Sequence, residues 1–188
     1  EDTRVTKKLL NHYSIKTRLS SYHAFNEHKQ LNKIIQKIEE GINIALVSDA
    51  GTPGISDPGF LLVRECIKKK IHICCLPGAT ACIPAIIQSG ITCNIFSFEG
   101  FLLLKKGRKK QLLRILNQKQ SSIIYESPHR ILKTLNQLYE MCPSRELVVL
   151  KELTKLNETE YRGSIKEIIE SISNSRIKGE FVIIINGQ

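Results

Sequence analysis

A loop dense in glycine, proline and aspartate is the part of the sequence best suited to chemistry. It reads VSDAGTPGISDPG over Val47–Gly59 and follows a short apolar run, Ile42–Val47, that predicts a buried strand. Its glycines remove side chains that would keep a ligand from the backbone, and its prolines stiffen the turn. The exposed amides, together with Asp49, Ser56 and Asp57, could bind a polar ligand. We therefore predict a ligand site in this loop.

The loop does not match the phosphate-binding patterns of nucleotide enzymes. It lacks the GK[ST] ending of a P-loop, and its glycine spacing differs from the dinucleotide-binding pattern. Its aspartates would repel a phosphate, so a cationic or zwitterionic ligand suits it better. The alternative is an ordinary turn in which Asp57 caps a helix that begins at Phe60. The density of Gly, Pro and Asp favours the ligand site.

A second loop of small residues, PGATA at Pro77–Ala81, follows the next predicted strand, Ile71–Leu76. Small residues at the start of a helix let a ligand lie against backbone amides. Loops that follow parallel strands lie along one edge of a sheet, so this loop is expected near the first one. A Pro-Gly pair after a strand is also commonly a plain turn, and that alternative stays open.

The elements that would position these loops alternate between strands and helices. Helices predicted at Leu31–Glu40, Phe60–Lys70 and Ala79–Gln88 around the two strands favour βαβ units. The second half predicts strands and helices in a different order: Asn94–Phe98, Ser121–Glu126, Arg145–Lys151 and Gly179–Asn186 as strands, and Lys105–Gln118, Pro128–Met141 and Ile165–Ser173 as helices. We therefore predict an α/β protein of two lobes, 1–93 and 94–188, with a mostly parallel sheet in the first and a mixed sheet in the second.

The charge of the chain indicates a polyanionic partner. Lys and Arg number 28 against 18 Asp and Glu, a formal net charge of +10. Such an excess raises the rate of encounter with phosphates and releases their counterions. Five positive charges lie close together, at Lys105, Lys106, Arg108, Lys109 and Lys110. The alternative is a lysine-rich composition spread over solvated faces, and the 6% aromatic content supplies few stacking platforms for single strands.

Other features of the composition exclude several classes of protein. The apolar runs are much shorter than the ~20 residues that span a bilayer. The first residues do not have the pattern of a secretory leader, so we expect none. The six cysteines form no CxxC pair, and no metal-ligand spacing appears. We expect a cytoplasmic protein without a metal site, whose cysteines are buried free thiols, with Cys74 and Cys75 inside a strand.

Six motifs that occur in order along the chain resemble one family. They are EDTR at Glu1–Arg4, VSDAGTPGISDPG at Val47–Gly59, PGATA at Pro77–Ala81, ESPHR at Glu126–Arg130, ELTK at Glu152–Lys155 and KGEFVIIINGQ at Lys178–Gln188. The set is similar to the RsmI family, the ribosomal RNA small-subunit methyltransferase I proteins of the tetrapyrrole (corrin/porphyrin) methylase superfamily. The resemblance implies the two-lobed class III methyltransferase fold, with S-adenosylmethionine between the lobes, and a homodimer. The implied reaction is methylation of the ribose 2′-oxygen of a cytidine in small-subunit rRNA.

The resemblance also implies which residues form the sites. The methyl donor would contact residues of three motifs and the residue that precedes the third, namely Asp49, Gly51, Thr52, Pro53, Gly54, Ile55, Ser56, Asp57, Gly78, Ala79, Thr80, Tyr125 and Glu126. The rRNA phosphates would contact the five basic residues named above and Arg130, without any reading of base sequence.

The chain departs from the family pattern at several points. The family begins with a strand and a Pro/Gly loop ahead of EDTR, and we expect both to be missing here, together with a helical C-terminal extension. Leu103 stands where the family commonly has proline. Asn157 stands where histidine is common, which argues against an essential proton role at that position.

The catalytic base stays unassigned. A ribose hydroxyl is a weak nucleophile at neutral pH, so methyl transfer needs in-line placement and a proton acceptor. Candidates are Asp2, Glu126, His129 and Glu152. Asp2 could instead pair with Arg4 or cap a helix, and Glu126 could hold a loop. We predict that Asp2 and Glu126 organise the site.

Two other functions remain as alternatives to rRNA methylation. One is methylation of a porphyrinoid small molecule, against which the basic excess and the ESPHR and ELTK motifs argue. The other is a non-catalytic RNA-binding fragment that keeps the charge without the donor site.

Overall fold

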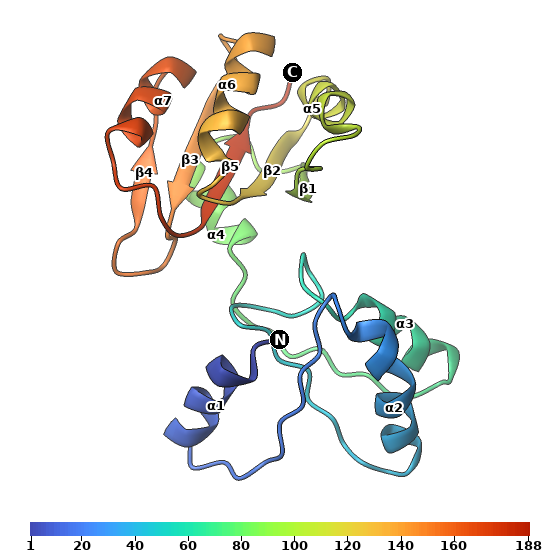
Figure 1. Ribbon diagram of the computed structural model, residues 1–188. Helices are drawn as coiled ribbons and strands as arrows, with labels where there is room; N and C mark the ends of the chain where they lie inside the picture. Colours follow the sequence, from blue (N-terminus) through green and yellow to red (C-terminus); the bar gives the residue numbers. More distant parts are fainter. The chain divides into compact units, whose positions relative to one another are not determined.

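The computed structural model describes all 188 residues of the chain, which pack as two compact units (Figure 1). Unit 1 is Glu1–Thr80 and unit 2 is Ala81–Gln188. The division into lobes predicted after residue 93 stays a prediction.

Unit 2 is built on a mixed sheet with the strand order β1-β2-β5-β3-β4. β1 pairs with β2 in parallel, whereas β5 runs antiparallel to its two neighbours β2 and β3, and β4 runs antiparallel to β3. The strands are β1 (Phe96–Phe101), β2 (Ser121–Glu126), β3 (Leu147–Lys151), β4 (Thr159–Tyr161) and β5 (Phe181–Ile185). The helices are α4 (Cys82–Ser89), α5 (Arg108–Leu116), α6 (Ile131–Met141) and α7 (Ile165–Ser173).

The central strand β5 shows why this sheet forms. Its sequence FVIII is buried throughout, which is the pattern of a strand covered on two faces. Phe181, Ile183 and Ile185 pack into a core with residues of α5, α6 and α7. Val182 and Ile184 pack on the opposite face with residues of α4. Helices therefore cover the two faces of the sheet, as Figure 1 shows for unit 2.

Unit 1 holds three helices joined by long irregular segments (Figure 1). They are α1 (Thr3–His12), α2 (Glu27–Glu39) and α3 (Phe60–Lys68). The small core of this unit is formed by Tyr22, Ile35, Leu62 and Cys66.

The predicted parallel sheet of the first lobe is not confirmed. Ile42–Val47 and Ile71–Leu76 form no strand, and most of their side chains are exposed, with Ile44 41% and Leu76 76% exposed. The apolar pattern of each segment favours a strand, but a strand forms only where a neighbouring strand satisfies its backbone N–H and C=O groups. Neither segment is paired with another strand. Cys74 and Cys75 are consequently exposed, and Cys93 is exposed as well. Of the six cysteines only Cys66 is fully buried, which corrects the prediction that the cysteines are buried.

All six cysteines are free, and no cluster of His, Cys, Asp or Glu side chains is arranged to hold a metal ion. None of the helices combines the length and the apolar character needed to cross a membrane.

Candidate functional site

The two small-residue loops of unit 1 are in direct contact. The backbone N–H of Thr52 donates to the carbonyl oxygen of Ala79 at 3.0 Å, and the Thr52 hydroxyl donates to the same oxygen at 3.1 Å. The loop Val47–Gly59 and the loop Pro77–Ala81 are therefore joined at one point, although 27 residues separate the two partners in sequence.

The two loops approach closely at a glycine in each. Gly51 has a φ of +74°, and a Cβ at this position would lie 3.0 Å from the Ala79 carbonyl oxygen. On the other loop, a Cβ at Gly78 would lie 3.2 Å from the Thr52 hydroxyl oxygen. Any larger residue at Gly51 would combine backbone strain with a close contact to backbone. The two glycines thus bring the loops together and leave the nearby backbone uncovered by side chains.

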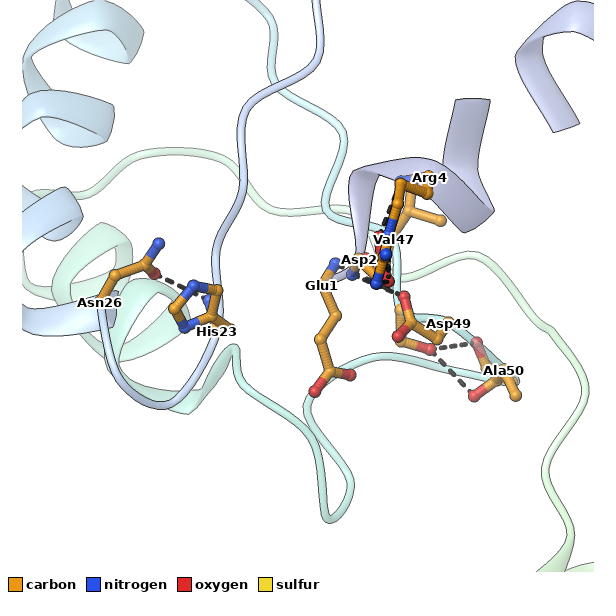
Figure 2. Close-up of polar contacts among 10 residues, drawn as sticks. Glu1, Asp2, Arg4, His23, Asn26, Val47, Asp49 and Ala50 are labelled. Carbon is orange, nitrogen blue, oxygen red and sulfur yellow. Dashed lines mark hydrogen bonds and ion pairs between the residues drawn. The ribbon is translucent and has the colours of Figure 1, made fainter. Parts of the chain in front are cut away.

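The N-terminal residues bind to the start of the first loop (Figure 2). The backbone nitrogen of Glu1 donates to the Val47 carbonyl at 3.1 Å, and the Asp2 N–H donates to Asp49 Oδ1 at 2.7 Å. Asp2 also caps α1 by accepting the Arg4 N–H at 2.8 Å, and it forms an ion pair with the Arg4 guanidinium at 2.6 Å. Asp2 is therefore an organiser that joins α1 to the loop, and its carboxylate is already engaged by Arg4.

Carboxylates gather beside this loop. Burial raises the pKa of the Glu1 side chain, and the negative charges of Asp57 and Asp49 raise that pKa further. The nearby His23 acts in the opposite direction on the Glu1 pKa. A concentration of negative charge next to uncovered backbone suits a ligand that carries positive charge and hydroxyl groups.

An open hollow of about 370 Å³ borders the second half of the loop. It is lined by the segment Ser56–Leu61, by Glu27 and His28 at the start of α2, and by Ala24, which precedes that helix. The predicted contact residues Ser56 and Asp57 thus face a space that the α2 terminus helps to enclose. In sequence, Gly54 and Ile55 lie between Thr52, which contacts Ala79, and Ser56, which lines the hollow.

Unit 2 contains the other predicted donor residues, Tyr125 and Glu126 at the end of β2. The Tyr125 ring is half-buried and packs edge-on against Phe98 and Phe101 of β1, with ring centroids 4.8 and 5.9 Å apart. Glu126 is only 1% exposed. Its Oε1 accepts from the Ser127 N–H and pairs with the Arg130 guanidinium, each at 2.8 Å. Its Oε2 accepts from the Thr134 hydroxyl at 2.7 Å.

The burial of Glu126 favours the alternative in which it holds a loop over the prediction that it is a base or a donor ligand. Each carboxylate oxygen already accepts from groups of the protein, and the carboxylate is almost fully buried. The alternative in which Glu126 holds a loop agrees with this geometry.

Four of the five clustered basic residues are exposed, namely Lys105, Lys106, Lys109 and Lys110. Arg108 is the exception at 4% exposure. Its guanidinium donates to the Leu103 carbonyl at 3.0 Å, to the Gln137 side chain at 2.9 Å and to the Thr134 hydroxyl at 2.6 Å. Such burial leaves Arg108 unsuited to phosphate contact. Arg130 is partly buried and donates to the Leu102 carbonyl at 3.1 Å.

The ELTK motif forms an ion cluster with the start of β5. Lys155 pairs with Glu152 at 3.0 Å and with Glu180 at 2.9 Å. The hydrogen bond from Lys155 lowers the pKa of Glu152, and the Glu180 N–H contributes in the same direction. Glu152 is thus held as an ion-paired carboxylate. His129 is exposed at the start of the turn that leads into α6.

Sequence reasoning did not single out His23 or Thr134. His23 lies in an irregular segment, where its backbone N–H donates to Asn26 Oδ1 at 2.8 Å (Figure 2). Its Nδ1 is buried without a hydrogen-bond partner. Thr134 lies on α6 and is fully buried between Arg108 and Glu126. A lone His in a loop and a Thr within a helix carry no local pattern that identifies such contacts.

Comparison with known proteins identifies the family. Residues 1–169 match the family of Tetrapyrrole (Corrin/Porphyrin) Methylases. The Ribosomal RNA small subunit methyltransferase I of Synechocystis sp. is 47% identical over the whole chain, which spans 68% of that protein. The protein of the same name from Bacillus subtilis is 45% identical, and the chain spans 64% of it. The one from Mycoplasmopsis pulmonis is 46% identical over 98% of the chain and 82% of its own length.

Solved structures show the same fold at low sequence identity. The methyltransferase CobJ aligns with a TM-score of 0.63 and 16% identity over 98% of the chain and 86% of its own. A uroporphyrin-III C-methyltransferase from Thermus thermophilus, complexed with S-adenosylhomocysteine, aligns with a TM-score of 0.58 and 12% identity over 91% of the chain and 78% of its own. The fold class is therefore the α/β fold of the tetrapyrrole methylases. With this fold and relatives of such identity, the chain belongs to the ribosomal RNA small subunit methyltransferase I family of the tetrapyrrole methylases.

Proposed function

We propose that the protein containing this chain transfers a methyl group from S-adenosylmethionine to the ribose 2′-oxygen of a cytidine in small-subunit rRNA. The observation that carries the proposal is the junction of the two glycine loops at Thr52 and Ala79, in a chain 47% identical to a protein named for rRNA methylation. The name of that relative specifies small-subunit rRNA, and the choice of ribose and of cytidine is part of the proposal.

The donor suits the loops of unit 1. S-adenosylmethionine supplies a methyl group on a positively charged sulfonium, together with ribose hydroxyls and a zwitterionic tail. The Gly51 and Gly78 positions leave backbone uncovered, and Glu1, Asp49 and Asp57 supply negative charge beside it. We propose that Asp49 and the segments Gly51–Asp57 and Gly78–Thr80 hold the donor, and that Tyr125 is a further donor contact.

The reaction is balanced by transfer of one methyl group and release of one proton. The bond from sulfur to the methyl carbon breaks as the bond from the 2′-oxygen to that carbon forms, and the hydroxyl proton passes to a base. The sulfonium loses its positive charge during the transfer. Strong electrostatic attraction from carboxylates would therefore stabilise the bound S-adenosylmethionine more than the transition state and slow the methyl transfer. Moderate attraction from several carboxylates at the loop is consistent with this requirement.

Contact with rRNA is proposed for the basic segment, defined here as Lys105–Lys110. Its exposed lysines lie at the N-terminal end of α5, which has no acidic residue in its first turn. Positive side chains at the positive end of a helix dipole are unfavourable for the helix itself. A phosphate placed there would interact favourably with the lysines and with the free amides of the helix end. We also propose that the protein is cytoplasmic and homodimeric.

Mass spectrometry of rRNA tests the proposed reaction. Small-subunit rRNA is compared between cells that lack the gene and the same cells carrying the full-length gene on a plasmid. We expect one ribose-methylated cytidine to be lost in the first and restored in the second. An unchanged set of ribose methyl groups would contradict the proposal, and a change in a porphyrinoid pool would support the small-molecule alternative.

A further inference from the structure

One buried carboxylate in unit 2 connects three elements. Glu126 ends β2, Arg130 directly precedes α6, and Arg108 begins α5. Arg130 Nη2 is 2.8 Å from Glu126 Oε1, and Arg108 Nη2 is 3.6 Å from Glu126 Oε2. The Glu126 and Arg108 side chains are 0% and 4% exposed. A single negative charge therefore faces two guanidinium groups in a region with little solvent.

The two arginines donate hydrogen bonds to the backbone carbonyl groups of two consecutive residues. Arg130 Nη1 donates to the Leu102 carbonyl at 3.1 Å, and Arg108 Nη1 donates to the Leu103 carbonyl at 3.0 Å. These carbonyls lie at the beginning of the loop Leu102–Gly107, which leads into α5. The loop ends at Gly107, which has a left-handed φ of +85° and precedes Arg108 itself. The Arg108 side chain thus bonds to the beginning of the loop, while its backbone directly follows the last residue of the loop.

The exposed lysines lie between these fixed points. Lys105 and Lys106 are exposed in the middle of the loop, and Lys109 and Lys110 are exposed in the first turn of α5. Lysine side chains are long and flexible, so their arrangement depends on the backbone that carries them. The backbone here is held by the arginines, and the arginines are oriented by Glu126 and Thr134.

We propose that Glu126 is a positioning residue, which fixes the loop Leu102–Gly107 through Arg108 and Arg130. The fixed loop then arranges the lysines of the basic segment to contact the sugar–phosphate backbone of RNA. The part concerning RNA rests on the proposed function. The part concerning the loop stands on the contacts of unit 2 alone.

Two variants of the full-length protein test the proposal. Glu126→Gln removes the charge shared by the arginines. Thr134→Val keeps the charges and the shape, but removes the hydroxyl that bonds to Glu126 Oε2 and accepts from Arg108. Thr134→Val covers the case in which Glu126→Gln does not fold. Glu140→Gln is the matched control, because Glu140 is an exposed carboxylate on α6.

The first measurement is limited digestion with trypsin under native conditions, with cleavage sites identified by mass spectrometry. We expect cleavage after Lys105 and Lys106 to become about tenfold faster or more, through local opening of the loop. Cleavage after Lys133 and Lys166 in the helices of unit 2 reports global unfolding and should stay at the level of the control. An unchanged rate after Lys105 and Lys106 in a folded variant would overturn the proposal.

The second measurement compares two affinities of the same variants. We expect weaker binding to small-subunit rRNA with an unchanged Kd for S-adenosylhomocysteine. A weakened Kd for S-adenosylhomocysteine with the loop still resistant to trypsin would overturn the proposal and make Glu126 a donor contact. A loop that opens without any reduction in RNA affinity would support the positioning of the loop and contradict the RNA contact assigned to its lysines.

Discussion

At the scale of single residues, a side chain at Gly51 would have two effects, which are backbone strain and a close contact with the second loop. Gly51→Ala places a side chain at φ +74° and 3.0 Å from the Ala79 carbonyl oxygen. The left-handed backbone alone costs about 1–2 kcal/mol of stability. Because the new methyl group also pushes the two loops apart, we expect the Kd for S-adenosylhomocysteine to rise roughly tenfold, about 1.4 kcal/mol, in calorimetry on the full-length protein.

Gly41→Ala is the control for this change. Gly41 has a similar φ of +88° but has no atom within 4 Å of the position of a Cβ. It should lose comparable stability and keep the donor affinity. Equal donor affinity in the two variants would contradict the assignment of the loop junction as part of the donor site.

Asp2 offers a prediction about ionisation. Hydrogen bonds from the Arg4 side chain and backbone lower the pKa of Asp2 from 3.8 to about 2. Since its folded pKa is depressed, the stabilising contribution of Asp2 is present above the unfolded value and is lost as the pH falls through about 2. An NMR titration of the Asp2 carboxyl carbon should show this midpoint. In Arg4→Ala the midpoint should move up toward 3.8, and a midpoint that does not move would contradict the role of Arg4.

At the scale of elements, the basic segment predicts a dependence on salt. Replacement of Lys105, Lys106, Lys109 and Lys110 by Glu should weaken binding to small ribosomal subunits. The slope of log Kd against log salt should fall by up to about 0.7–0.9 for each phosphate that the variant no longer neutralises. A variant with Glu at Lys119, Lys133, Lys166 and Lys178 changes the net charge equally at other positions of unit 2. If the two variants showed the same slope of log Kd against log salt, the net charge of the protein would account for RNA binding, and the position of the lysines would not matter.

The sequence predicted some elements better than others, for physical reasons. Ser121–Glu126 and Ile165–Ser173 were predicted with the bounds that the structure has, because their apolar pattern coincides with clear end signals. Ser164 and Glu167, for example, form a capping box at the start of α7. The helix α1 was not predicted, since TRVTKKLLNH is mostly polar and is stabilised at its start by the Asp2 cap. The short strand β4 exists through its pairing with β3, which no local pattern indicates.

In the candidate site too, features that depend on neighbouring residues in the sequence were predicted, whereas contacts between distant residues were not. The density of glycine in the loop Val47–Gly59 was visible in the sequence, and the structure explains Gly51 by its contact with the second loop. The burial of Arg108 was not visible, because nothing distinguishes it within KKGRKK from the exposed lysines. Its partners Thr134 and Gln137 are 26 and 29 residues away in sequence.

At the scale of the whole molecule, the two units differ in how much apolar surface they bury. Unit 2 has a core on each face of its sheet, whereas the core of unit 1 comprises Tyr22, Ile35, Leu62 and Cys66 with a few partly buried neighbours. Because hydrophobic burial is the main stabilising term, we expect the amides of β5 to exchange with deuterium most slowly. The amides of α2 and α3 should exchange faster. Mass spectrometry of exchanged peptides measures this, and the reverse order would contradict it.

The same difference predicts the effect of a core truncation. Ile183 is fully buried in the central strand, so Ile183→Ala should lower the free energy of unfolding of unit 2 by about 2–5 kcal/mol. Denaturant titration followed by circular dichroism measures this decrease. Ile87→Ala on the exposed side of α4 is the control, and a decrease equal to that of Ile183→Ala would contradict the central place of β5.

The sharing of Glu126 between two guanidinium groups has an evolutionary consequence. Removal of the acid leaves two cations facing each other, and removal of either arginine leaves a backbone carbonyl without its donor. A single substitution at any of the three positions is therefore expected to cost stability, and a compensating change at a second position is expected to restore part of it. A protein library that randomises the three positions together should therefore recover functional combinations in which acid and bases change in concert, and not one at a time.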